Sequence, residues 1–348
     1  MRICISVLIL FVSFSGHTQV VGGKAAFEFL NAPSNAHLSA IGQYNVSVID
    51  KDPYLANANP ALLNKKMSKA VSASYMSYAG GIALYSVAGA YDFKSIGPVS
   101  LSVTTLNYGK LKETLDDGTE VGEFSSQDYA ISLGKSYTVG VITIGANAKL
   151  LGSRIASYKA NAWGIDAGAV FKHPVQDLTF GFAIKNLGKV YKNYTETSKD
   201  SLPFDVQIGL SYRFKNAPLR LSWTFHQLNK WDNVYNDPAQ TTKVDEKGQP
   251  VQKKVTNFER LLRHQIVALE IMPAKFMDIR FGYNYLMSRE LSLTDGLSSS
   301  GISFGAALRW EFLEAAYTHT IAQKAGGMNT FTLNVNFGKI GDLKTREN

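Results

Sequence analysis

The sequence predicts an all-β protein, an antiparallel β-barrel of the outer-membrane type with about fourteen strands. Three observations predict it. Apolar and polar residues alternate along most of the chain, short and long connections alternate between the expected strands, and aromatic residues recur where the strands end. The composition agrees, because only 18% of the 348 residues are charged while 11% are aromatic.

The first segment predicts export. Arg2 precedes an apolar run from Ile3 to Phe14, and small and polar residues follow it. This run is shorter than the ~20 residues that a transmembrane helix needs, so residues 1–18 are predicted to be a secretory signal peptide. Cys4, the only cysteine, would be removed with it. The mature chain could then use neither disulfides nor thiolate chemistry.

The dominant period from about Ala70 to Phe337 is two residues, which is the period of a β-strand. A soluble β-sandwich would also show this alternation, with its polar face in water. A membrane barrel would instead turn its apolar face to lipid. The expected strands lie near residues 70–78, 81–93, 98–108, 124–133, 141–155, 160–171, 178–187, 203–214, 219–227, 265–273, 277–285, 301–310, 313–320 and 329–337.

The connections favour the membrane barrel. Those on one side are short, whereas the other side carries the long segments Gly109–Glu123, Gly188–Leu202, Leu228–His264 and Ser288–Ser300. Outer-membrane barrels have short periplasmic turns and long external loops. Residues 70–338 are therefore predicted to form the transmembrane barrel, and residues 339–348 a periplasmic tail. The tight first hairpin, at Gly80–Gly81, is an exception to the pattern.

Aromatic residues support the same interpretation. Those at the short-turn ends of strands would form one interfacial girdle, and three tyrosines would contribute to a girdle at the opposite interface. The first set is Phe93, Phe171, Phe214, Trp310 and Phe337, and the second is Tyr75, Tyr108 and Tyr285.

Searches for reaction chemistry return little, and the chain is predicted not to be an enzyme. Gly301–Gly305 matches the letters G-x-S-x-G, but it lies in an alternating strand, whereas a nucleophile elbow needs a strand-to-helix turn. The six histidines are scattered, so neither a metal nor another cofactor is expected. The net charge of +8 is spread along the chain without a basic block, which argues against nucleic-acid binding.

Charged residues on the polar face of the strands are expected to point into the barrel, because charges are costly in lipid. A lumen that mixes both signs would form ion pairs and contact a segment inside the barrel. These residues are Asp128, Lys149, Asp166, Lys185, Asp205, Arg213, Arg220, Glu270, Arg280, Arg309 and Glu314.

The long segment Leu228–His264 is the best candidate for contact with a partner protein, although a solvated loop would have the same composition. It includes a predicted short helix over residues 258–263. Trp231 and Tyr235 are natural interface anchors, and Arg260 and Arg263 are the candidate charged contacts.

Residues 19–69 lack sustained alternation and carry a more specific pattern. Phe27-Glu28-Phe29-Leu30 precedes an A-x-G and a V-x-D element and then Asn59-Pro60-Ala61-Leu62-Leu63. This leader, placed before about fourteen strands, resembles the PorV/PorQ family, which is related to FadL-type transporters, and it is more similar to the PorQ members. The resemblance implies that residues 19–69 form a plug in or beneath the lumen, and Asn59, Pro60 and Ala61 are its candidate motif because Asn-Pro favours a turn. An ordinary loop that caps the barrel base is the alternative.

The resemblance also implies a function. Members of the family belong to the type IX secretion system of Gram-negative bacteria and act at the cell surface in an attachment complex with the PorU sortase and PorV. The expected role is a docking platform in outer-membrane lipid for PorZ, which binds anionic lipopolysaccharide, so that any contact of this chain with lipopolysaccharide would be indirect. The alternative is a FadL-like transporter for hydrophobic small molecules, which needs an apolar pocket inside the barrel.

Overall fold

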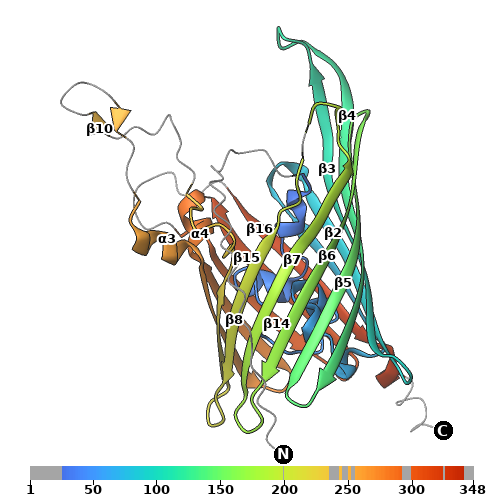
Figure 1. Ribbon diagram of the computed structural model, residues 1–348, viewed down its shortest axis with the longest axis vertical. Coiled ribbons are helices and arrows are strands. Elements are labelled where there is room, and N and C mark those ends of the chain that lie inside the picture. The colour runs from blue at the N-terminus through green and yellow to red at the C-terminus, as the bar shows by residue number, and fades with distance from the viewer. Residues whose placement is uncertain are drawn as a thin grey trace, which may run out of the picture.

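Fourteen strands of the described residues close into one antiparallel barrel, in which β1 pairs with β2 on one side and with β16 on the other (Figure 1). This closed barrel confirms the predicted fold class. The computed structural model describes residues 26–198, 200–234, 243–244, 250–251, 255–291, 299–323 and 326–340. The predicted signal peptide and residues 341–348 of the predicted tail lie outside the described residues.

The barrel strands follow the predicted order. Their bounds are β1 Ala70–Ser77, β2 Ala83–Phe93, β3 Gly97–Thr114, β4 Glu120–Val139, β5 Ile142–Ile155, β6 Tyr158–Lys172, β7 Leu178–Lys192, β8 Asp205–Arg213, β9 Leu219–Phe225, β12 Gln265–Ala274, β13 Met277–Asn284, β14 Ile302–Arg309, β15 Leu313–Gln323 and β16 Gly326–Asn336. A separate pair, β10 (Lys243–Val244) and β11 (Pro250–Val251), lies within the segment between β9 and β12.

The helices are short. Before β1 the chain forms η1 Glu28–Asn31, α1 Ala36–Ala40, α2 Leu55–Ala58, η2 Pro60–Leu62 and η3 Lys65–Met67, and later η4 Ala79–Gly81, α3 Asn257–Arg263 and α4 Tyr285–Glu290. The predicted short helix at 258–263 is thus present as α3, whereas α4 begins where the prediction ended a strand. No helix among the described residues has the length and apolarity to cross a membrane.

The barrel wall has the opposite polarity to a soluble protein. Along β4, Tyr129, Ile131 and Leu133 are exposed, while Asp128, Ala130 and Ser132, which alternate with them, are buried. The pattern continues on neighbouring strands, where large apolar residues face outward and Ser, Thr, Gly and charged residues face inward. An exterior of this kind is stable against hydrocarbon and not against water, so the alternation marks a transmembrane wall.

One predicted external loop is mostly strand. Residues Gly109–Glu123 continue β3 and β4 as a hairpin that projects past the rest of the barrel and turns at residues 115–119 (Figure 1). Lys110 bonds Glu123 across the hairpin at 3.1 Å. Cross-strand charge pairs replace the apolar alternation there, which explains why the period-two signal was missed.

The predicted girdle at the short-turn end is largely confirmed, since Phe93, Phe214, Trp310 and Phe337 are exposed there and Phe171 is half-buried. The prediction for Tyr108 at the opposite end is wrong. Its hydroxyl donates to Asp128 Oδ2 at 2.7 Å, so the ring faces the lumen. Tyr285 lies in α4, whereas Tyr75 is exposed and packs against Tyr85 with the two rings tilted by 46°.

The outward face predicts the cost of a charge in the wall. Val103 lies on β3 with 42% of its surface exposed, paired with Val87 and Ile131 on the flanking strands. We expect Val103→Arg to lower the free energy of unfolding in lipid vesicles by about 2–4 kcal/mol, because arginine would be placed in hydrocarbon. Urea titration of the inserted barrel measures this. Leu115→Arg, at the tip of the β3–β4 hairpin, is the matched control, and equal losses in both variants would contradict a membrane-embedded wall.

Candidate functional site

Residues 26–69, called the inner segment below, lie within the barrel (Figure 1). The segment is held by hydrogen bonds to inward-facing side chains of the wall. Ala36 N donates to Thr332 Oγ1 at 2.8 Å and Thr318 Oγ1 donates to Ala36 O at 2.7 Å. Farther along, Asn147 Nδ2 donates to Ala56 O at 2.9 Å and Ser136 Oγ to Leu63 O at 2.7 Å. Small hydroxyl and amide side chains on the wall thus satisfy the irregular backbone that they enclose.

The Asn59-Pro60-Ala61 motif is a buried turn at the start of η2. The Asn59 side-chain oxygen accepts from Ala61 N at 3.0 Å, and its amide donates to Val46 O at 2.8 Å. Pro60 occupies the first helical position, where its missing N–H costs nothing. The motif therefore ties two parts of the inner segment together.

Glycines in the wall allow the inner segment to approach closely. A Cβ added at Gly168 would overlap the Asn59 side-chain oxygen, and one at Gly181 would overlap Val46 O. Any larger residue at these positions would displace the inner segment from β6 and β7.

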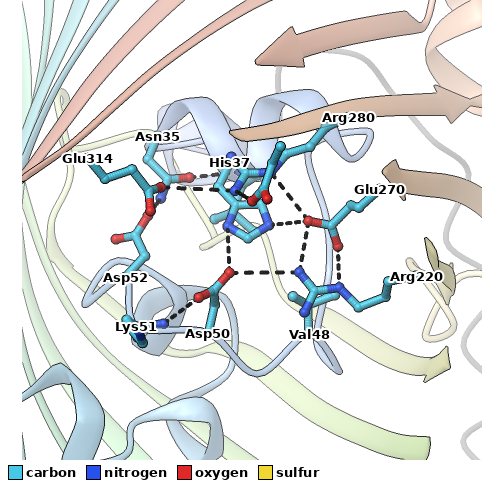
Figure 2. A network of polar contacts seen from close by, with 12 residues as sticks. Asn35, His37, Val48, Asp50, Lys51, Asp52, Arg220, Glu270, Arg280 and Glu314 are labelled. Carbon is cyan, nitrogen blue, oxygen red and sulfur yellow. Dashed lines mark hydrogen bonds and ion pairs between the residues drawn. The ribbon is translucent and has the colours of Figure 1, made fainter. Parts of the chain in front are cut away.

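A network of charges joins the inner segment to β9, β12, β13 and β14 (Figure 2). Glu270 is its centre. One carboxylate oxygen bonds His37 Nε2 at 2.9 Å, and both oxygens are held by Arg220 at 2.5 and 2.8 Å. Arg280 Nε lies 3.3 Å from the same carboxylate. Glu270 and Arg280 are each 1% exposed, so these charges are stable only as partners of one another.

The network extends to both sides of Glu270. Asp278 bonds Arg280 and Arg309, each at 2.9 Å, and Arg309 also bonds Glu314 at 2.6 Å. From the inner segment, Asp50 lies 3.7 Å from Arg220 and from Arg309. Burial alone would raise the pKa of Asp50, but His37 and the arginines lower it to about 2, so this carboxylate stays ionised. The prediction that lumen charges pair with one another and contact a segment inside the barrel is confirmed here.

A second charge cluster lies at an irregularity between β6 and β7. The pairing shifts between Ile165 and Ala167, so that Asp166 stands opposite both Lys185 and Asn186 of β7, and the Asp166 side chain is fully buried on the inward face. Asp166 bonds Lys149 at 2.7 Å and Lys185 at 3.3 Å, and it accepts from Asn186 N at 2.8 Å. The Lys185 ammonium in turn donates to Asn57 O of the inner segment. This second cluster therefore also anchors the inner segment to the wall.

A cavity of about 710 Å³, called the outer cavity below, lies between the inner segment and the barrel end that bears α4. Apolar side chains form much of its lining, and a smaller set of polar groups interrupts them. The apolar group includes Tyr78, Ile82, Phe204, Leu286, Met287 and Met328. A second cavity of about 70 Å³ shares Tyr44 and Asp205 with it and reaches Lys149 and Lys185. The two cavities therefore adjoin, and the smaller one borders the two lysines of the Asp166 cluster.

The candidate partner residues lie away from this cavity. Trp231 stacks on His264 with ring centroids 5.7 Å apart and is 52% exposed. Arg260 lies 3.6 Å from Asp232, and Arg263 bonds Glu259 at 3.2 Å within α3. Tyr235 lies outside the described residues. The structure brings Trp231 and α3 together as an exposed group, but both arginines have partners within the chain.

The described residues offer no constellation for a reaction. Ser303 of the G-x-S-x-G match lies in β14, faces inward and bonds Thr320 Oγ1 at 3.0 Å. No group of three or more His, Cys, Asp or Glu in the described part of the chain has the geometry to hold a metal ion. Among the predicted lumen charges, Arg213 is exposed at the short-turn end.

Several interior residues were not predicted. His37 and Asp50 come from a segment without periodicity, so nothing in their local sequence indicated partners more than 150 residues away. His226 was set aside as one of several scattered histidines, although it follows β9 directly and borders the outer cavity. Its position after a clean alternating strand was the available signal.

The closed wall, apolar outside and polar inside, defines the class of the protein as an outer-membrane β-barrel. The TodX monoaromatic hydrocarbon channel, as a deltaS2S3 mutant, matches with a TM-score of 0.50 and 12% identity over 87% of this chain and 99% of that chain. The Ralstonia pickettii toluene transporter TbuX matches with a TM-score of 0.48 and 11% identity over 88% and 99%. A Pseudomonas aeruginosa FadL homologue matches with a TM-score of 0.47 and 12% identity over 87% and 98%.

At these identities the likeness shows the fold alone. No family model matches the sequence. No curated protein matches it either. The PorV/PorQ resemblance and the link to type IX secretion remain predictions.

The Glu270 network predicts a large effect from one substitution. Glu270→Gln removes the carboxylate between Arg220 and Arg280 without changing the size of the side chain, so Arg220 loses its main partner and Arg280 loses one of its two buried carboxylates. We expect the free energy of unfolding to fall by about 3–5 kcal/mol, as measured by urea titration of the inserted barrel. Glu123→Gln, which removes the exposed pair with Lys110, should cost less than about 1 kcal/mol. A Glu270→Gln barrel as stable as the control would show that the network does not stabilise the interior.

Proposed function

We propose that the protein is a FadL-like outer-membrane barrel that binds and takes up hydrophobic small molecules. The observation that carries this proposal is the outer cavity. Its volume of about 710 Å³ lies within the ~300–1,000 Å³ typical of small-molecule sites. Holding the inner segment in place does not require an open cavity with apolar walls, whereas a transporter for apolar molecules does. The fold neighbours include proteins described as a hydrocarbon channel and a toluene transporter, which agrees with the proposal.

Passage through the barrel would require the inner segment to move. The smaller cavity extends the enclosed space only as far as Lys149 and Lys185, and the Glu270 network occupies another part of the lumen. In the proposed cycle a ligand enters the outer cavity, and a rearrangement near Asp166 opens the way inward. The Glu270 network holds the inner segment in place meanwhile, because it makes more ion pairs than the Asp166 cluster.

The cavity hypothesis predicts that large side chains at its lining reduce uptake. We expect the double variant Ile82→Trp, Met287→Trp to lower the initial rate of radiolabelled toluene uptake at least threefold, in cells that have no other barrel for it. Both residues line the outer cavity. Met277→Trp, at the start of β13 on the short-turn side, is the control. Uptake that is equal in the double variant, the control and cells without the protein would contradict transport.

A second candidate function is a docking platform in the type IX attachment complex, which would hold PorZ at the cell surface together with PorU and PorV. A specific feature favours it. Phe258 on α3 is 69% exposed, and Leu261 and Trp231 beside it are also exposed. Apolar side chains on a segment beyond the barrel wall are typical of protein interfaces. The enclosed inner segment suits a platform as well, because docking needs no open lumen.

The docking hypothesis predicts the loss of a surface partner. We expect the double variant Phe258→Ser, Leu261→Ser to insert normally into the outer membrane. Less PorZ-like surface protein should be recovered with it when the tagged barrel is purified from solubilised outer membranes. Mass spectrometry identifies the partners. Val175→Ser, exposed in the short turn between β6 and β7, is the control. An unchanged set of partners in the double variant would place any docking surface elsewhere.

A further inference from the structure

Two polar side chains that border the outer cavity have no hydrogen-bond partner within the part of the chain that the structure describes. His226 is 1% exposed and Asn233 is 5% exposed. Neither ring nitrogen of His226, nor the amide nitrogen or oxygen of Asn233, meets a partner among the described residues. Burial of a polar group without a partner is costly, and most such groups in folded proteins are satisfied. Two of them at one cavity therefore indicate a missing ligand.

The His226 ring is held in a fixed position. Its backbone N–H donates to His264 O at 3.0 Å, and its carbonyl oxygen lies 2.8 Å from His264 Nδ1. The ring stacks on Tyr44 with centroids 4.8 Å apart and an angle of 12° between the planes. One face of the ring is thus used for packing, and neither ring nitrogen has a hydrogen-bond partner among the described residues. A neutral imidazole offers one donor and one acceptor, and a side-chain amide offers both kinds as well.

The charges around the outer cavity decide which ligands can reach these groups. Glu28, Asp205 and Glu290 border it, against one cation, Lys230. Asp205 accepts hydrogen bonds from Gln207 and from the backbone of Gln227, so it is already satisfied. An anionic head group would be repelled by these carboxylates. An uncharged group that both donates and accepts, such as a hydroxyl, matches the free imidazole and amide.

We propose that the outer cavity selects hydrophobic molecules that carry an uncharged hydroxyl-type head group and discriminates against the corresponding carboxylates. The head group binds at His226 and Asn233, and the apolar body packs on Ile82, Met287 and Met328. This assignment rests on the proposed uptake function and names its substrate class. Discrimination by paired polar groups is strong, because a ligand that lacks the matching group leaves them unsatisfied.

Three ligands of nearly equal size test the assignment: toluene, benzyl alcohol and benzoate. Their binding to the full-length barrel in lipid nanodiscs is measured by native mass spectrometry at pH 7. We expect benzyl alcohol to bind at least tenfold more tightly than benzoate. His226→Phe keeps the stack on Tyr44 but removes both ring nitrogens. This variant and Asn233→Leu should each weaken the binding of benzyl alcohol about fivefold. Both variants should change the affinity for toluene by less than about twofold.

His173→Phe, in the short turn after β6, is the control and should leave all three ligands unchanged. Benzoate that binds as tightly as benzyl alcohol, or variants that weaken toluene as much as benzyl alcohol, would overturn the head-group assignment while leaving hydrophobic uptake in place. A barrel that binds none of the three ligands would overturn both proposals.

Discussion

The structure depends on one constraint: every backbone hydrogen bond of the wall must be made within the wall, because hydrocarbon offers no partner. The pairing of β1 with β16, from Ala70 opposite Asn336 to Ser77 opposite Asn329, meets this constraint by removing the last open edge. Closure of the barrel then determines which residues each face of the wall can carry. Outward residues must be apolar, and the inward residues, cut off from bulk solvent by the wall, must find partners inside. The inner segment and the two charge clusters supply those partners.

The buried charges of the interior stabilise one another as a group, and no single ion pair is strong by itself. Replacing a buried ion pair by apolar residues is often neutral, whereas removing one member is severely destabilising. Glu270 illustrates the point, since it meets His37 from the inner segment and Arg220 and Arg280 from the wall. Glu270 thereby fixes the position of the inner segment, which contains no strand, relative to β9 and β13. The wall glycines at Gly168 and Gly181 complement these ion pairs by shape, because the absence of a side chain leaves room for the Asn59 side chain and the Val46 carbonyl group.

Much of the barrel was predictable because its signal is local. A strand that faces lipid on one side and a polar lumen on the other alternates strictly, and the β4 residues Tyr129 to Leu133 show this in the letters alone. Where charge pairs replace the apolar residues, as at Lys110 and Glu123, the alternation is lost and the sequence predicts a loop in place of a strand. The candidate site was harder to predict, because its contacts join residues that are far apart in the sequence. His37 meets Glu270 across 233 residues, and no spacing within the inner segment indicates that contact. The Asn-Pro turn could be recognised, but its contact with the wall could not.

The contacts of α1 have a consequence for the order of assembly. Ala36 is bound by Thr332 and Thr318, residues 296 and 282 positions later in the chain. The segment that is synthesised first is therefore enclosed by the strands that are synthesised last. Threading it into a barrel that has already closed would require its helices and buried charges to pass through an occupied lumen. The wall must instead fold around it, so the final strand pairing and the enclosure of the N-terminal region occur as one step. Such a step joins distant parts of the chain and pays the full loop-closure entropy before it gains contacts, which makes it slow.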